Sequence, residues 1–267
     1  MPPLLAAVAT LLGACALHSD HQPASTEAAQ PAQAAAAADQ PAAKLKSLRT
    51  PAERSDFHAT ASYDDVNAFL NDLAAASPLV RISDIGASGE SRKIPLALLA
   101  DPPVANADEA RRTGKLIIAM LGGIHSGECD GKEALLALAR DLAAARATGK
   151  DAAKSDSPDA LSKLLDSCIL AFIPIYNPDA NEKLDPKNRP GQVGPDTMGK
   201  RENAAGLDLN RDFVKLEAPE TRALLKFINQ YDPHILIDTH TTNGSFHRYP
   251  LTYDTNKNPA GDAKLLE

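Results

Sequence analysis

One stretch of seven residues, GGIHSGE at 122–128, constrains the fold more than any other part of the chain. The apolar run 115–121 before it is too short for a core helix and ends at two glycines, which predicts a buried strand. Residues 132–145 after it carry apolar side chains at helical spacing and predict a helix. His125 and Glu128 therefore lie between the carboxyl end of a strand and a helix, where open α/β sheets place ligand sites.

The spacing of His125 and Glu128 suits a shared metal ion. Residues three apart lie on one face of a turn, so the imidazole and the carboxylate can converge. This pair of ligands suits zinc, and a catalytic zinc usually takes three protein ligands and leaves one position to water. His-x-x-Glu also occurs by chance in surface loops, so the hypothesis needs a third ligand elsewhere in the chain.

Length and composition restrict the class of protein. The chain has 267 residues, a net charge of −7 and 43% hydrophobic residues, which indicates one globular domain with additional segments. The mild acidity argues against nucleic-acid binding, which requires a basic face. With 4% aromatic residues and no Trp, a surface that stacks on sugars or bases is not expected.

The amino terminus predicts export. Residues 4–14 form an apolar run that has the length of a signal-peptide core but is too short to span a bilayer. Cys15 follows Leu-Gly-Ala and resembles the lipidated cysteine of a bacterial lipobox. We expect a lipoprotein-type signal peptide at 1–14, a lipid anchor at Cys15 as the one attachment to a membrane, and a periplasmic, outer-membrane or secreted location. Residues 1–3 lack Lys and Arg, so a plain cleaved signal stays open as the alternative.

A tether is expected between this signal and the folded part. Residues 15–50 are mostly rich in Ala, Pro and Gln, and such a composition cannot bury a core. The catalytic domain is expected at 57–267. Cys129 and Cys168 are expected to be two buried thiols rather than a disulfide.

Strands and helices alternate through the folded part, which predicts a three-layer α/β/α sandwich. An early hairpin makes the expected sheet mixed, and a long ordered loop, 180–206, is expected over the site. The other expected elements are a helix at 66–76, strands at 80–85, 94–99, 168–175 and 234–238, and a helix at 218–231.

His240 is the expected third ligand. It lies just past a strand, as His125 does, and the carboxyl ends of neighbouring parallel strands meet at one edge of a sheet. His234 starts that strand, and six residues at roughly 3.3 Å each place it about 20 Å away. His247 and Cys129 stay open as weaker candidates.

Five ordered motifs make the chain resemble the M14 zinc carboxypeptidase family over about residues 57 to 267. They are His125-x-x-Glu128, Asn177-Pro178-Asp179, Arg201-Glu202-Asn203, Asp208-Leu209-Asn210-Arg211 and Asp238-Thr239-His240. The resemblance implies a monomer with one Zn²⁺, held by His125, Glu128 and His240, that acts on peptides with a free carboxyl terminus.

The resemblance also implies roles for residues around the metal. Asp208 would orient the ring of His125, and Arg201 would stabilise the oxyanion. Read from the residues alone, Asp208 could instead cap a turn, and Arg201 could be a solvated charge.

Asn210 and Arg211 would hold the terminal carboxylate of a peptide, because the planar guanidinium binds carboxylates through two nitrogens. The alternative for Arg211 is a structural salt bridge to Asp212.

One departure concerns the general base. In the family it is a glutamate far beyond the third ligand, whereas 27 residues follow His240 here. Glu267 is too close to His240 in sequence to serve. We therefore expect the general base to be absent from this chain, the sandwich to be incomplete at its carboxyl end, and the chain to be a fragment of a longer enzyme.

The function expected first is that of a zinc metallocarboxypeptidase. A zinc deacylase of N-acyl amino acids shares the ligand set, and a catalytically inactive lipoprotein that binds zinc or peptides is the third hypothesis. The helix and hairpin before the metal strand, together with export, favour the peptidase.

Overall fold

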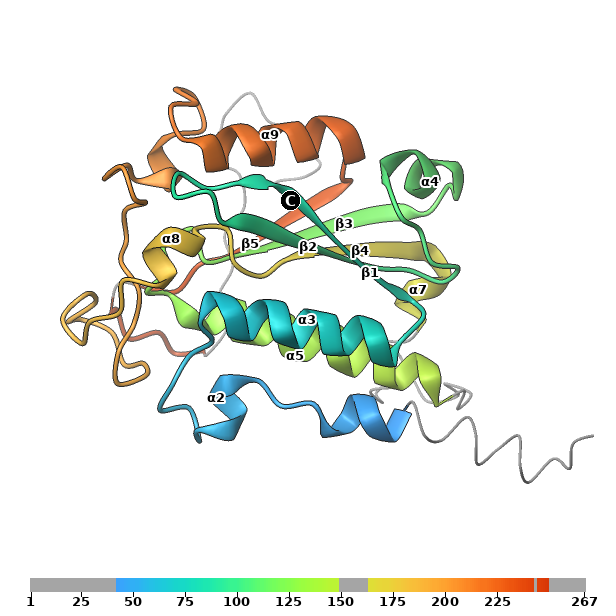
Figure 1. Ribbon diagram of the computed structural model, residues 1–267, viewed down its shortest axis with the longest axis horizontal. Helices are drawn as coiled ribbons and strands as arrows, with labels where there is room; N and C mark the ends of the chain where they lie inside the picture. Colours follow the sequence, from blue (N-terminus) through green and yellow to red (C-terminus); the bar gives the residue numbers. More distant parts are fainter. Residues whose placement is uncertain (1–41, 149–162, 243, 250–267) are drawn as a thin grey trace, which may run out of the picture.

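A mixed sheet of five strands forms the centre of the fold in the computed structural model, which describes residues 42–148, 163–242 and 244–249 (Figure 1). The strand order is β1-β2-β4-β3-β5, with β1 antiparallel to β2, β2 antiparallel to β4, and β3 parallel to both β4 and β5. The bounds are β1 Val80–Ala87, β2 Lys93–Leu99, β3 Leu116–Gly122, β4 Cys168–Ile173 and β5 Ile235–Thr239. The expected hairpin and the mixed sheet are confirmed.

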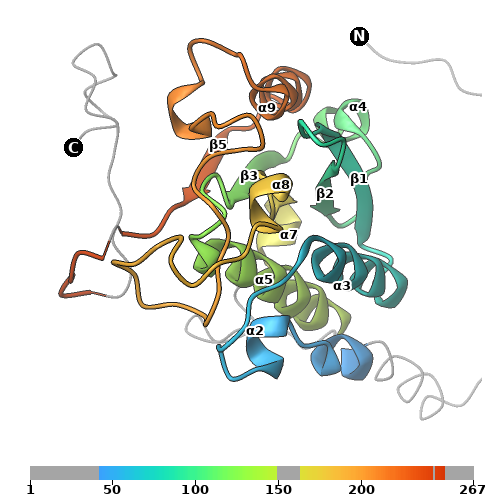
Figure 2. The same cartoon turned by 60° about the vertical axis from the view of Figure 1, so that its left-hand side comes forward.

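Helices cover both faces of this sheet, as the expected three-layer sandwich requires. Helices α3 and α5 lie side by side on one face in both views, and α9 lies on the other (Figures 1 and 2). Each face has its own apolar core of buried side chains. The bounds are α2 Pro51–Arg54, α3 Tyr63–Ala76, α4 Ala107–Arg112, α5 Cys129–Ala147, α7 Leu164–Ser167, α8 Pro178–Asn181, a 3-10 helix Leu209–Arg211 and α9 Pro219–Tyr231.

Local chemistry explains where the elements begin and end. Ser62 and Asp65 form a capping box, in which each side chain accepts from the other's backbone N–H at 3.1 Å, so α3 starts before the first apolar residue. Strand β4 stops at Ile173 instead of the expected residue 175, because Pro174 has no N–H for the ladder.

The expected tether boundary at residue 50 is wrong. Residues 42–47 are helical, and Leu45 is fully buried in the core that α3 and α5 share with the sheet. Thr50 then caps α2, and its hydroxyl accepts from the Glu53 N–H at 3.2 Å. Residues 42–50 therefore belong to the folded unit. The expected signal peptide, Cys15 and the first part of the tether lie outside the described residues.

Several smaller expectations can also be compared with the structure. Cys129 and Cys168 are both buried and free, as expected. Strand β5 exposes the apolar side chains of residues 235–237. Within the described ranges, no helix is long and apolar enough to cross a membrane.

Candidate metal centre

The topology brings two loops together at one edge of the sheet. Strands β3 and β5 are parallel neighbours, with Gly122 opposite Thr239 at their carboxyl ends. Gly123 then adopts φ +69°, a conformation that favours glycine, and turns the chain out of the strand toward His125. His240 follows β5 directly, so both histidines reach the same edge.

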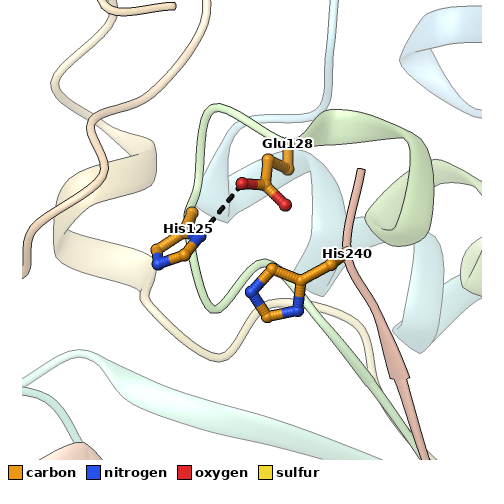
Figure 3. Close-up of side chains that lie close together, drawn as sticks. All are labelled: His125, Glu128 and His240. Carbon is orange, nitrogen blue, oxygen red and sulfur yellow. Dashed lines mark hydrogen bonds and ion pairs between the residues drawn. The ribbon is translucent and has the colours of Figure 1, made fainter. Parts of the chain in front are cut away.

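Three side chains converge there (Figure 3). His125 Nδ1 lies 2.9 Å from Glu128 Oε1, and the rings of His125 and His240 are 4.9 Å apart between centroids at 83°. One ligand atom from each residue lies within 4.8 Å of the others. His125 and Glu128 are 2% and 3% exposed, whereas the His240 side chain is 28% exposed. His125 and Glu128 are therefore shielded from solvent, whereas solvent can reach His240.

The contacts of the His125 ring fit a cation at this place. Its Nε2 lies 3.0 Å from Asp208 Oδ1 and its Nδ1 lies 2.9 Å from Glu128 Oε1; in the tautomer whose Nε2–H donates to Asp208, Nδ1 is an acceptor that faces the Glu128 carboxylate. Two acceptors that face each other at 2.9 Å need a proton or a metal ion between them. Donors at about 2.0–2.2 Å from a tetrahedral zinc ion stand roughly 3.3–3.6 Å apart, so these side chains can hold zinc once their ligand atoms draw together by about 1 Å.

Asp208 both contacts the ring of His125 and caps a turn, the two roles that the sequence left open. It accepts from His125, and its side chain caps the 3-10 helix by accepting from Asn210 N at 2.9 Å. Burial raises the pKa of its carboxyl, but the hydrogen bonds from His125, Arg201 and Asn210 N outweigh burial and lower that pKa. Asp208 is therefore an anion that fixes the orientation of the His125 ring.

Arg201 is not a solvated charge. Its Nε and Nη2 donate to Asp208 Oδ2 at 3.1 and 2.9 Å, and its side chain is 30% exposed. Its Nη1 lies 3.4 Å from His125 Nδ1, which places the guanidinium beside the candidate metal position.

Asn210 and Arg211, which are adjacent in the chain, make different contacts. Asn210 Nδ2 lies 3.3 Å from His240 Nε2, whereas Arg211 is exposed and donates to the Asn210 carbonyl at 2.9 Å. Among the ion pairs of the described residues, none joins Arg211 to Asp212. Asp212 accepts instead from the backbone N–H groups of residues 217 and 218 at 2.9 Å each.

The weaker ligand candidates lie elsewhere or make other contacts. His234 Nδ1 accepts from Ile117 N at 3.1 Å, at the far end of β5, as the sequence predicts. His247 is exposed and is not in the group of ligand atoms. Cys129 is not in the group either, and burial raises the pKa of its thiol.

Two carboxylates set the charge of the group. A hydrogen bond to Asp238 Oδ2 at 2.8 Å raises the pKa of His240 against the effect of burial. Burial raises the pKa of Glu128, but the contact with His125 and the hydrogen bond from Thr241 N outweigh burial and lower it. Glu128 is therefore an anion, as a metal ligand must be.

Sequence reasoning missed Arg189. It is 8% exposed, and its Nη2 donates to Glu128 Oε1 at 2.8 Å. It belongs to the loop expected over the site, and a pocket of about 570 Å³ there is lined by residues 188–192 and 200–202. No periodicity or motif distinguishes this arginine from the other cations of that loop.

Comparison with known proteins agrees with this arrangement. Residues 66–267 match the family described as zinc carboxypeptidase. Human carboxypeptidase D is 29% identical over 63% of this chain and 11% of its own length. A probable carboxypeptidase 2 of Arthroderma benhamiae is 30% identical over 57% of this chain and 24% of its own. The chain thus spans a quarter or less of these two relatives.

A solved structure, the metallo-carboxypeptidase of Burkholderia cenocepacia, is 22% identical to this chain. The match covers 70% of this chain and 42% of that one, with a TM-score of 0.48.

Proposed function

Because the chain belongs to the zinc carboxypeptidase family, we propose that the protein is a zinc-dependent metallocarboxypeptidase that hydrolyses the carboxy-terminal peptide bond of peptides. The observation that carries this proposal is the convergence of His125, Glu128 and His240 within 4.8 Å at the carboxyl ends of β3 and β5. A site at this edge of the sheet, open at His240, can receive a peptide end.

His125, Glu128 and His240 would hold the ion. Bound zinc lowers the pKa of a water molecule toward neutrality and polarises a carbonyl group. Asp208, 3.0 Å from His125 Nε2, would keep the N–H of His125 on that nitrogen, so that Nδ1 would present its lone pair to the ion.

Arg201 is proposed to stabilise the negative charge that develops on the scissile carbonyl oxygen. Its Nη1 is 3.4 Å from His125 Nδ1, and Asp208 holds the other two nitrogens in place. A guanidinium that is fixed before the reaction needs no reorganisation, and removing one such donor costs roughly 10²–10³ in kcat.

Asn210 and Arg211 are proposed to bind the terminal carboxylate. They are adjacent in the 3-10 helix, and Asn210 already reaches the His240 ring at 3.3 Å. The exposed guanidinium of Arg211 makes a contact to its own loop at 2.9 Å, which a carboxylate can replace.

The test uses protein purified from the cells that make it, because the proposal concerns the whole protein. A chelator should abolish, and added zinc should restore, hydrolysis of N-blocked dipeptides with a free carboxyl terminus. The same dipeptides with an amidated carboxyl terminus are the matched control and should not be hydrolysed. Absence of zinc-dependent hydrolysis would refute the proposal.

Two results would point to the alternatives. Faster cleavage of N-acyl amino acids than of blocked dipeptides would indicate the deacylase. Zinc and carboxylate binding without turnover of either substrate would indicate a binding protein.

We also propose export with a lipid anchor at Cys15, on the sequence pattern alone. Intact mass of the protein from its own cells should show the loss of residues 1–14 and an acylated amino terminus. An unmodified amino terminus at Met1 would contradict this.

A further inference from the structure

A closed ring of hydrogen bonds joins the two loops that carry the candidate ligands. Arg189 Nη2 donates to Glu128 Oε1 at 2.8 Å, and Arg189 Nε donates to Gln192 Oε1 at 2.9 Å. Gln192 Nε2 donates to Thr241 Oγ1 at 2.8 Å and also to the Thr242 carbonyl. The Thr241 N–H donates to Glu128 Oε2 at 2.8 Å, which closes the ring.

The ring contains one proposed ligand and the neighbour of another. Glu128 contributes both carboxylate oxygens, and Thr241 directly follows His240. Strand pairing holds Gly122 beside Thr239, but the loops 125–128 and 240–242 lie beyond that pairing, so further contacts set how their side chains stand to each other. Arg189 and Gln192 provide a bridge of such contacts from a third segment, in which Arg189 lies 61 residues after Glu128 and Gln192 lies 49 residues before Thr241.

The packing around the bridge is tight where it meets the first loop. A Cβ atom at Gly127 would lie 2.5 Å from Arg189 Cγ and 2.6 Å from the Gly199 carbonyl oxygen. Glycine at 127 therefore permits the close approach that lets Arg189 reach Glu128.

A buried arginine next to a cation site is unfavourable unless it has a compensating role, since like charges repel strongly in a medium of low dielectric. The chain nevertheless buries this guanidinium on the carboxylate of a proposed ligand, at 8% exposure. Arginine also suits a bridging position, because its planar fork donates in two fixed directions.

We propose that Arg189 and Gln192 are positioning residues of the metal centre, which hold the loop of Glu128 and the loop of His240 at the separation that the ion requires. This inference rests on the proposed metal site. It predicts that opening the ring weakens zinc binding even where no ligand and no charge is changed.

The decisive variant is Gln192→Leu in the full chain, because it removes two donors without altering charge. Residues that hold the metal ligands in place by hydrogen bonds typically contribute 10–100-fold to metal affinity, so the zinc dissociation constant should rise about 10-fold or more. The measurement is competition with a fluorescent chelator. The visible absorption of the cobalt-loaded protein should change as well, since it reports coordination geometry.

Arg189→Lys tests the second member with its charge kept. A single ammonium group cannot reproduce the fork that reaches Glu128 and Gln192, so zinc affinity should again fall about 10-fold. The double variant should lose little more than the stronger single variant, because one broken link already opens a ring. Additive losses would contradict the ring.

The matched control is Asn188→Leu, the same change of amide to aliphatic side chain in the same loop. Asn188 Nδ2 donates to the carbonyls of residues 183 and 198 at 2.7 and 2.8 Å, outside the ring. Its zinc dissociation constant should stay within threefold of the wild-type value. If Asn188→Leu lost as much zinc affinity as the ring variants, the loop would affect the metal site only through its overall folding. That result would overturn the proposal.

Failure of this inference can be told apart from failure of the proposed function. Wild-type protein that binds zinc, with both ring variants unchanged in affinity and cobalt spectrum, overturns the positioning role and leaves the metal site intact. Wild-type protein that binds no zinc overturns both. Circular dichroism of each variant shows whether it is folded, and Arg189→Lys keeps the test available if Gln192→Leu does not fold.

Discussion

Replacing Asp208 by asparagine distinguishes the roles of its two carboxylate oxygens at the candidate metal centre. One oxygen accepts from His125 Nε2 at 3.0 Å and from Asn210 N at 2.9 Å, and the other accepts from Arg201 at 2.9 and 3.1 Å. Asparagine can keep its oxygen toward His125 and Asn210. Its amide nitrogen would then face the donors of Arg201, so the arginine loses its anchor.

The structure gives the size of the expected effects. Zinc affinity should fall about 10-fold in Asp208→Asn, at the lower end of the range for such partners, because the oxygen toward His125 is retained. Asp208→Ala, which loses the contacts of both oxygens, should lower zinc affinity about 10–100-fold. The Ala variant should also lose about 1 kcal/mol of stability through the missing cap.

These values are measured by chelator competition for zinc and by urea unfolding of the metal-free protein. The pH dependence of stability is a further test of the role of Asp208. The folded state lowers the pKa of Asp208, so the ionised side chain stabilises the protein above the unfolded pKa near 3.8. That contribution is lost as the pH falls through the lower folded value. Zinc affinity of Asp208→Ala within threefold of wild type would refute the orienting role.

Three further predictions follow from the same contacts. Gly127→Ala should displace the loop of Arg189 and destabilise the protein by about 1–3 kcal/mol in urea unfolding; an unchanged midpoint would contradict the close packing. Asp238 raises the pKa of His240, so Asp238→Asn should destabilise the metal-free protein by about 0.5–1 kcal/mol below pH 6.5, and the difference should vanish as the pH rises through the raised folded pKa. An equal difference at pH 9 would show that the ion pair is not its source. Asp212→Ala removes two backbone hydrogen bonds at 2.9 Å and should cost about 1–2 kcal/mol at pH 7; the cost should shrink as the pH falls through the lowered pKa of Asp212, and a cost that persists at pH 2 would argue for packing instead.

Local patterns determined much of this protein before any tertiary structure was considered. The capping box at Ser62, the apolar strands and the glycines after β3 are contacts between residues a few positions apart, so they can be read directly from the sequence. His125, Glu128 and His240 were predicted for the same reason, because each is placed by the end of a strand. The places of Arg201, Asp208 and Asn210 beside the metal were implied only by the resemblance to the zinc carboxypeptidase family.

Tertiary structure decided what irregular segments do. The loop at 180–206 has no periodicity, so nothing in its sequence shows that Arg189 turns inward to Glu128 while Lys200 stays exposed. Composition likewise assigned residues 42–50 to a tether, whereas Leu45 is fully buried in the core that contains side chains of α3 and α5. Such contacts join positions far apart in the chain, and their free energy depends on the shape of a partner surface that exists only after folding.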